Sequence, residues 1–355
     1  MAATLRRARP EAEVVWVAQP APAQVVTPHP AVDRVVAWHP TEGASGVVRL
    51  WRALAALRCD VVFDLQRYLK AAWPTLGLRA PVRVGLDPSK TRDGLRWLHN
   101  AAPPRGPWKH TQDLFLDALA VAGVPRPDPL RWPLELTDDE RTAGRALRDR
   151  VEGRPLCAVA VASGNARKDW PAERYVPVVE ALERDFGFAV ALVGGPARHE
   201  RRAAAAIARA ARTRPLDLLG DSVRALIAHV AAAALVVSPD TGTLHLAHAL
   251  RVPVVGLFGH TNPWRVGPYE RFHDLVVDAY TDPAEHPDPS RYEPRHGRME
   301  RIRPEDVLAR VELALERYGA AGPEGASGPG HAGDEPRPNR GDGAARERAD
   351  PRGAE

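Results

Sequence analysis

The clearest chemical signal in this sequence lies in one short loop, Ser238–His245, which reads SPDTGTLH. An apolar run precedes this loop, Asp240 is a residue type that caps helices, and Gly242 lets a ligand approach the backbone closely. The free amides of a first helical turn, together with the helix dipole, form a site for an anion. His245 follows Thr241 by four residues, so both side chains lie on one helical face. On its own, the loop fits a capped helix with a structural histidine better than it fits a ligand site.

A second loop, Ala162–Pro171, combines small and polar residues with a lysine. Ser163 and Gly164 leave room for phosphate oxygens, and Lys168 supplies a mobile positive charge. A charge-assisted hydrogen bond from that lysine to a phosphate is worth about 1.5–3 kcal/mol. An ordinary strand-to-helix turn has a similar composition, so this loop is also ambiguous when it is taken alone.

A third loop, Val193–Pro196, carries two glycines and precedes a helix start that contains Glu200. Glu200 could accept hydrogen bonds from ribose hydroxyls, or it could simply favour the helix N-terminus. A nicotinamide-dependent oxidoreductase would need Gly-X-Gly-X-X-Gly between strand and helix, with an acidic residue about 20 positions later. Gly194-Gly195 lacks that spacing, so the sequence argues against an oxidoreductase.

Strands and helices alternate around these three loops. Apolar runs predict the strands, and amphipathic or Ala-rich stretches between them predict the helices. The predicted strands are Leu156–Ala162, Ala189–Val193, Leu235–Ser238 and Val254–Phe258, and the predicted helices are Pro171–Phe186, Arg198–Arg212, Ser222–Ala234, Thr243–Leu250 and Glu305–Tyr318. This alternation is typical of an α/β protein with a parallel, doubly wound sheet, whose ligands bind where the strands end. We therefore expect Lys168 and the Asp240–Thr243 turn to share one cavity.

The chain divides into segments that differ in composition and in the pattern of predicted strands and helices. Residues 1–135 mix short β-rich runs with helical stretches and are predicted to form a first domain. The Pro-rich, charged residues 136–154 interrupt the alternation of strands and helices. We expect them to link the first domain to a second domain, residues 155–318. Residues 319–355 have almost no large apolar side chain, which predicts a disordered tail. In the first domain the predicted strands are 14–17, 34–36 and 61–65, and the predicted helices are 46–58, 67–78 and 110–122.

The bulk composition excludes several classes of protein. Of 355 residues, 44% are hydrophobic and 26% are charged, which is typical of a globular chain and not of a disordered one. No apolar run approaches the roughly 18 residues of a membrane helix, and no signal peptide is evident, so we expect a cytoplasmic protein. The net charge of +4 is spread over mixed helical faces, which argues against nucleic-acid binding. Cys59 and Cys157 have no metal-binding neighbours, which predicts reduced, inert thiols.

Taken together, the loop residues stand in an order that resembles glycosyltransferase family 9, the bacterial heptosyltransferases of lipopolysaccharide core assembly. The resemblance runs from Ala3 to Tyr318. The residues that carry it in the second half are Lys168, Trp170, Pro171, Asp240, Thr241, Gly242, His245, Ala249, Leu250, Pro253, Leu257, Phe258, Gly259, Thr261, Pro263, Gly267 and Pro268. Further matches are His29-Pro30, Val32–Val35, Asp64–Gln66, Lys70, Arg83–Gly85, Met299–Ile302 and Pro304-Glu305.

The resemblance implies the GT-B fold, in which two Rossmann-like domains face a cleft and the C-terminal one holds most of the nucleotide sugar. It implies transfer of a heptose or related sugar from an ADP-sugar to the inner core of lipopolysaccharide, with inversion and with no bound metal or cofactor. The expected partners are therefore this donor, the lipopolysaccharide acceptor and, peripherally, the cytoplasmic face of the inner membrane. We expect a monomer.

The resemblance also assigns residues to the two substrates. The implied donor-binding set is Ser163, Gly164, Lys168, Glu200, Asp240, Thr241, Gly242, Thr243 and His245. Gln66 and Lys70, four residues apart on one predicted helix, and Arg83 become candidates for the anionic groups of the acceptor. Solvated surface residues would explain those three equally well.

Two features depart from the family pattern. Family members open with a strand and a Gly-Asp loop whose Asp is the expected general base, whereas residues 1–10 here already resemble the end of the first helix. Either the true start lies upstream, which we favour, or the chain is a catalytically impaired nucleotide-sugar-binding protein; the catalytic residue is therefore unknown. The segment 278–298 lacks the cysteines common in relatives and carries Asp282, His286, Asp288 and His296. We interpret it as a plain loop in preference to a metal site.

Overall fold

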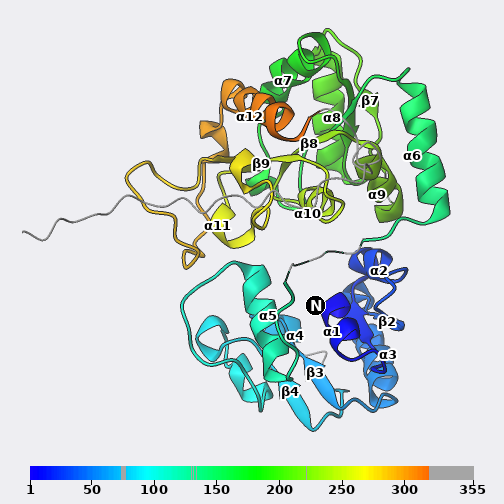
Figure 1. Cartoon of the computed structure of the whole chain (residues 1–355), viewed down its shortest axis with the longest axis vertical. Coiled ribbons are helices and arrows are strands. Elements are labelled where there is room, and N and C mark those ends of the chain that lie inside the picture. The colour runs from blue at the N-terminus through cyan, green and yellow to red at the C-terminus, as the bar shows by residue number, and fades with distance from the viewer. Residues whose placement is uncertain (73–76, 129, 131, 133, 221, 320–355) are drawn as a thin grey trace, which may run out of the picture.

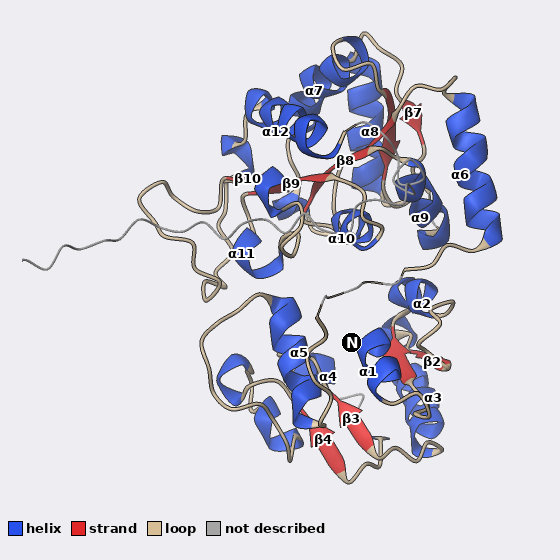
Figure 2. Ribbon diagram, viewed as in Figure 1, coloured by secondary structure: helices blue, strands red, loops and turns tan. Residues whose placement is uncertain are grey.

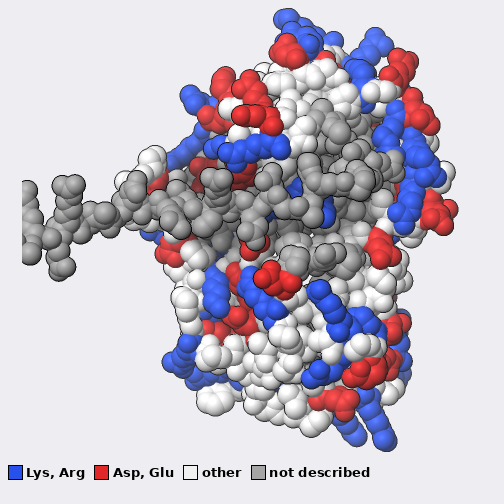
Figure 3. Space-filling model, in the orientation of Figure 1, with Lys and Arg blue, Asp and Glu red and all other residues white. Residues whose placement is uncertain are grey.

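The computed structural model describes residues 1–72, 77–128, 130, 132, 134–220 and 222–319. The predicted tail, residues 319–355, therefore lies outside the described residues except for Gly319. The described chain forms two lobes, the first within residues 1–121 and the second within residues 138–318 (Figure 1). Figure 3 shows basic and acidic side chains interspersed over both lobes on the face in view.

A six-stranded parallel sheet forms the centre of the second lobe (Figure 2). Its strands, in sheet order, are β10 (Val276–Asp278), β9 (Val254–Phe258), β8 (Leu235–Pro239), β5 (Leu156–Ala160), β6 (Ala189–Val193) and β7 (Leu216–Asp217). The four predicted strands are confirmed, and every residue of β5, β6, β8 and β9 is buried, which is why each reads as a continuous apolar run. The apolar pattern misses β7 and β10 because strands of 2 and 3 residues are too short to produce one.

Helices pack against this sheet (Figure 2). They are α7 (Ala172–Arg184), α8 (Arg198–Ala210), α9 (Val223–Ala232), α10 (Gly242–Ala249) and α12 (Pro304–Tyr318), while the short α11 (Pro263–Val266) lies in the connection after β9. The indole nitrogen of the buried Trp170 donates to Ile302 O at 3.1 Å and so fastens the start of α7 to the segment that precedes α12. The five helices predicted for this part of the chain are confirmed.

Residues 136–154, which the sequence predicts to be only a connection, instead contain the helix α6 (Asp138–Arg150). Thr137 and Glu140 begin this helix with a capping box: the hydroxyl accepts from Glu140 N at 3.3 Å, and the carboxylate accepts from Thr137 N at 2.8 Å. Leu147 and Val151 are buried in the core of the second lobe, and α6 packs along α9. The second lobe therefore begins before residue 155.

The first lobe is a looser α/β assembly. Its elements are α1 (Ala2–Ala8), β1 (Val15–Ala18), α2 (Pro20–Val26), β2 (Arg34–Ala37), α3 (Gly43–Ala55), β3 (Val61–Phe63), α4 (Leu69–Ala72), β4 (Val82–Val84) and α5 (Thr111–Val121). Parallel pairs β1–β2 and β3–β4 form two separate sheets, and among the described residues no strand joins them. Leu5 of α1 packs against the apolar residues of both halves, so α1 holds the two sheets together.

The two lobes contact each other through polar groups. α2 lies against α9, where the Gln24 side chain accepts a hydrogen bond from the first amide of α9 at 3.2 Å. Elsewhere Tyr269 Oη donates to Asp113 Oδ1 of α5 at 2.7 Å. His110, the N-cap of α5, donates from Nε2 to Gly267 O at 3.0 Å. These contacts fix how the strand ends of one lobe face those of the other.

Candidate donor site and acceptor face

Asp240 is the centre of a polar cluster at the carboxyl end of the second-lobe sheet. Its carboxylate is buried, since the residue is only 8% exposed. Lys168 Nζ donates to Oδ2 at 2.7 Å, and Thr261 Oγ1 donates to the same oxygen at 2.8 Å. His245 Nε2 lies 3.5 Å from Oδ1. These four residues, called the Asp240 cluster below, confirm the prediction that Lys168 reaches the turn after β8.

Three neighbouring strands bring the Asp240 cluster together. Asp240 directly follows β8, and Thr261 lies in the connection that leaves β9. Lys168 ends a short 3₁₀ helix, Ala166–Lys168, whose start is fixed because the Asn165 side chain accepts from Arg167 N. The sheet order β9-β8-β5 places all three strand ends side by side, so the three connections converge.

Burial and charge act in opposite directions on Asp240. Burial raises the pKa of this carboxyl group, but the hydrogen bond from His245 and the positive charge of Lys168 outweigh burial and hold the pKa of Asp240 below its usual range. Asp240 is therefore ionised at neutral pH and holds both side chains in place. Lys168 keeps 27% and His245 keeps 53% of its side-chain surface exposed, so both retain polar atoms for a ligand.

The helix α10 begins beside the Asp240 cluster. Its N-cap is Thr241, whose hydroxyl accepts a hydrogen bond from Thr243 N at 3.1 Å. The expectation that Asp240 caps this helix is wrong, because its carboxylate is turned toward partners on other loops. A Cβ added at Gly242 would meet nothing within 4 Å, so the backbone here is open to a ligand. A helix start next to a lysine can bind an anion.

The loop after β5 is shaped by Ser163 and Asp169. The Ser163 amide and hydroxyl both donate to Asp169 Oδ1, at 2.7 and 2.8 Å, and Ser163 is buried. Its side chain therefore sets the loop conformation, whereas Gly164 is exposed with open space where a Cβ would stand. His199 Nε2 donates to Ser163 O at 2.7 Å and ties α8 to this loop, a contact that no sequence pattern indicates.

Glu200 faces the two glycines after β6. Its carboxylate accepts a hydrogen bond from Gly195 N and is buried. A Cβ at Gly194 would lie 2.7 Å from Glu200 Oε2, so a side chain at this position would displace the Glu200 carboxylate. One carboxylate oxygen of Glu200 is thus occupied by the loop, and the predicted ribose contact depends on the other.

Of the three candidates for the acceptor, Gln66 and Lys70 do not lie on one helix as predicted. Gln66 lies in a turn before α4, where its amide donates to Asp64 Oδ1 at 3.0 Å, so it does not share a helical face with Lys70. The side chain of Lys70 lies outside the described atoms. Arg83 donates to Leu98 O at 3.0 Å and to Leu78 O at 2.9 Å. Its guanidinium thus holds two segments of the first lobe together.

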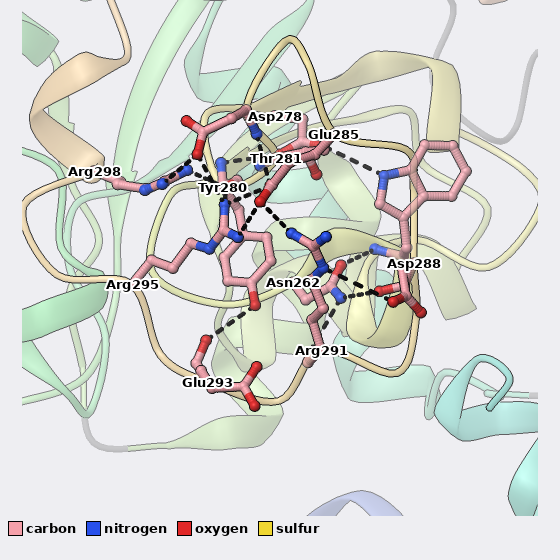
Figure 4. Close-up of polar contacts among 12 residues, drawn as sticks. Asn262, Asp278, Tyr280, Thr281, Glu285, Asp288, Arg291, Glu293, Arg295 and Arg298 are labelled. Carbon is pink, nitrogen blue, oxygen red and sulfur yellow. Dashed lines mark hydrogen bonds and ion pairs between the residues drawn. The ribbon is translucent and has the colours of Figure 1, made fainter.

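The segment 278–298 forms a loop held by ion pairs (Figure 4). Arg295 binds both oxygens of Glu285, at 2.8 and 2.9 Å, and Arg298 binds Asp282 at 2.6 Å. Asn262, in the connection after β9, donates to the backbone of this loop and anchors it near the Asp240 cluster. Arginines thus occupy the carboxylates that a metal would need. Within the described part of the chain, no three His, Cys, Asp or Glu side chains could hold a metal ion.

Comparison with known proteins places this site in a family. Residues 47–294 match the sequence model of Glycosyltransferase family 9 (heptosyltransferase). The chain is 27% identical over 278 residues to the lipopolysaccharide core heptosyltransferase OpsX of Haemophilus influenzae, a similarity that covers 78% of each chain. It is 31% identical over 289 residues to lipopolysaccharide heptosyltransferase 1 of Pseudomonas aeruginosa, which covers 75% of each.

Solved structures show the same architecture. The glycosyl transferase family 9 structure from Veillonella parvula has a TM-score of 0.74 at 22% identity and covers 89% of this chain and 92% of that one. The ADP-heptose lps heptosyltransferase II of E. coli has a TM-score of 0.67, also at 22% identity. The predicted α/β GT-B fold is therefore confirmed. Since the family match spans most of the sequence, this chain belongs to glycosyltransferase family 9, the heptosyltransferases.

Proposed function

We propose that this protein transfers a heptose from an ADP-sugar to the inner core of lipopolysaccharide, with inversion and without a bound metal. Its relatives OpsX and heptosyltransferase 1 support the sugar and the class of acceptor, because both are lipopolysaccharide heptosyltransferases. The observation that carries the proposal is the Asp240 cluster. There a lysine, a histidine and the start of α10 meet at three strand ends.

In the proposed reaction the acceptor hydroxyl attacks the anomeric carbon of the donor from the side opposite the diphosphate. The bond from that carbon to the phosphate oxygen breaks, and its electron pair leaves with the diphosphate. Lys168 and the amides at the start of α10 stabilise the negative charge that develops there. The hydroxyl proton passes to a general base that we do not assign.

The remaining assignments are proposals of the same kind. Gly164 and the Ser163 loop would contact the diphosphate, and Glu200 would contact the ribose. Positive charge at the leaving group comes from Lys168, which supports a metal-independent reaction. We also propose a monomer that contacts the membrane peripherally. Among the described residues, no helix combines the length and the apolar character that crossing a bilayer requires.

One assay separates this proposal from its alternative, a nucleotide-sugar-binding protein of the same fold without catalysis. The chain is incubated with ADP-heptose and a purified inner-core acceptor, and ADP release and acceptor mass are followed. We expect one heptose residue to be added for each ADP released. Binding of ADP-heptose in a calorimeter without any turnover would favour the alternative. If the chain neither binds ADP-heptose nor transfers the sugar, both the proposed transferase activity and the binding-only alternative are wrong.

A further inference from the structure

Two arginines from different lobes lie on one tyrosine ring. The guanidinium carbon of Arg67 is 3.4 Å from the centroid of the Tyr292 ring, and that of Arg265 is 4.1 Å from the same centroid. The two guanidinium carbons are therefore at most 7.5 Å apart. Trp108 completes the group, with its ring centroid 4.5 Å from that of Tyr292. We call Arg67, Arg265 and Tyr292 the Tyr292 cluster.

The positive charge of this cluster is not balanced by acidic side chains. Among the described residues, no carboxylate lies within ion-pair distance of Arg67 or Arg265. In the same loop as Tyr292, by contrast, Arg295 and Arg298 are each paired with acidic partners. Burial lowers the pKa of the Arg67 guanidinium, and the nearby charge of Arg265 acts in the same direction. Two like charges held together without a counterion favour an anionic ligand.

Polar atoms of the cluster are poorly satisfied within the protein. Arg265 Nε and the Tyr292 hydroxyl are buried, and Arg265 acts on that hydroxyl as a hydrogen-bond donor, but among the described residues no well-aligned bond is made to either atom. A ligand that supplies acceptor oxygens would therefore be favoured there. Arg67 directs its Nε to Lys90 O at 2.9 Å, which leaves its two terminal nitrogens for other acceptors.

The Tyr292 cluster lies near the proposed donor site, on the side from which a sugar acceptor would approach. Arg265 lies in α11, four residues after Thr261 of the Asp240 cluster, on the same connection from β9. Arg67 lies in the connection that follows β3, so it too is near the carboxyl end of a parallel strand. Figure 1 shows α11 on the side of the second lobe that faces the first. A molecule bound by the Tyr292 cluster would therefore lie beside the proposed donor site.

We propose that Arg67, Arg265 and Tyr292 form a subsite for a phosphate monoester group carried by the sugar acceptor. This inference rests on the proposed function, because it identifies a chemical group of that acceptor. A phosphate monoester carries about −1.5 to −2 charges and has three terminal oxygens. Each planar guanidinium group can bind two oxygens at once. Two such groups therefore match the charge and the three oxygens of a phosphate better than they match a singly charged carboxylate, which has only two oxygens. The tyrosine hydroxyl supplies a further donor.

The test uses two forms of one inner-core acceptor, phosphorylated and treated with alkaline phosphatase, and the full chain as wild type, R67Q and R265Q. R96Q is the matched control, because Arg96 also stacks on an aromatic ring, 4.6 Å from the centroid of the exposed Trp97. We expect R67Q and R265Q to raise KM for the phosphorylated acceptor about 10- to 100-fold. KM for the dephosphorylated acceptor and for ADP-heptose should change much less, and R96Q should resemble the wild type.

Equal losses with both acceptors would overturn the inference, since the arginines would then only join the lobes. Unchanged KM values in R67Q and R265Q would overturn it as well. A wild type that transfers heptose to neither acceptor would instead count against the proposed function. In that case titration with inorganic phosphate, with ADP present to fill the donor site, still tests the subsite. Weaker phosphate binding by the R67Q/R265Q variant supports the inference, and equal binding refutes it.

Discussion

Replacing Lys168 with methionine tests whether this lysine does more than neutralise Asp240. Its ammonium lies 2.7 Å from the carboxylate of a residue that is 8% exposed. Removing one partner of a fully buried ion pair costs about 3–5 kcal/mol. Thr261 still donates to Asp240 in the variant, and the Lys168 side chain is 27% exposed, so we expect a smaller loss of stability, about 1–3 kcal/mol. Loss of a donor to the leaving diphosphate should lower kcat about 10²–10³-fold.

The double variant K168M/D240N separates the two effects. It removes the carboxylate that loses its lysine partner in K168M, so chemical denaturation should show stability recovered toward that of the wild type. Initial rates of heptose transfer should stay low, because the diphosphate still lacks its lysine. R167M is the control, since Arg167 is the exposed cationic neighbour of Lys168. Recovery of activity together with stability would show that Lys168 acts only on Asp240 and not on the diphosphate.

Two further predictions concern the contacts between the lobes. Tyr269→Phe removes the hydroxyl that donates to Asp113 across the lobes, and we expect it to lower the free energy of unfolding by about 1–3 kcal/mol in a urea titration; no change would exclude a role for this bond. His110 is neutral in the folded protein, where burial lowers its pKa to about 4, and its imidazole accepts from Gln112 N while it donates to Gly267 O. The unfolded state therefore binds the proton more readily, so stability should fall by up to about 3 kcal/mol as pH drops from about 6.5 to 4. His110→Asn keeps a capping acceptor without a titrating ring and should flatten this pH dependence; an unchanged slope would assign it to other groups.

Much of the second lobe could be predicted from sequence because its strands are buried on both faces. The runs at β5, β6 and β9 are apolar throughout, and the run at β8 is apolar from Leu235 to Val237, which is typical of strands covered on both faces. α6 could not be predicted in the same way. Its few buried residues, such as Leu147, are separated by charged residues that face solvent, so the segment reads as a polar connection.

The donor site could be predicted only in part. Loops that follow neighbouring parallel strands must converge, which is why Lys168 and Asp240 meet. The cap of α10 could not be predicted, because Asp and Thr both cap helices and the choice depends on partners from other loops. The contact of Arg67 with Tyr292 joins the two lobes, and no local spacing in the sequence indicates it.

Calorimetric titration with ADP and with AMP shows whether the second lobe grips a diphosphate, because the two ligands differ only in the second phosphate. If the Asp240 cluster and the start of α10 hold the diphosphate, the wild type should bind ADP at least about 10-fold more tightly than AMP. K168M should lose most of that difference while its affinity for AMP changes little. Equal affinity of the wild type for ADP and AMP would mean that this site does not hold the second phosphate, and an undiminished preference for ADP in K168M would mean that Lys168 does not contact it.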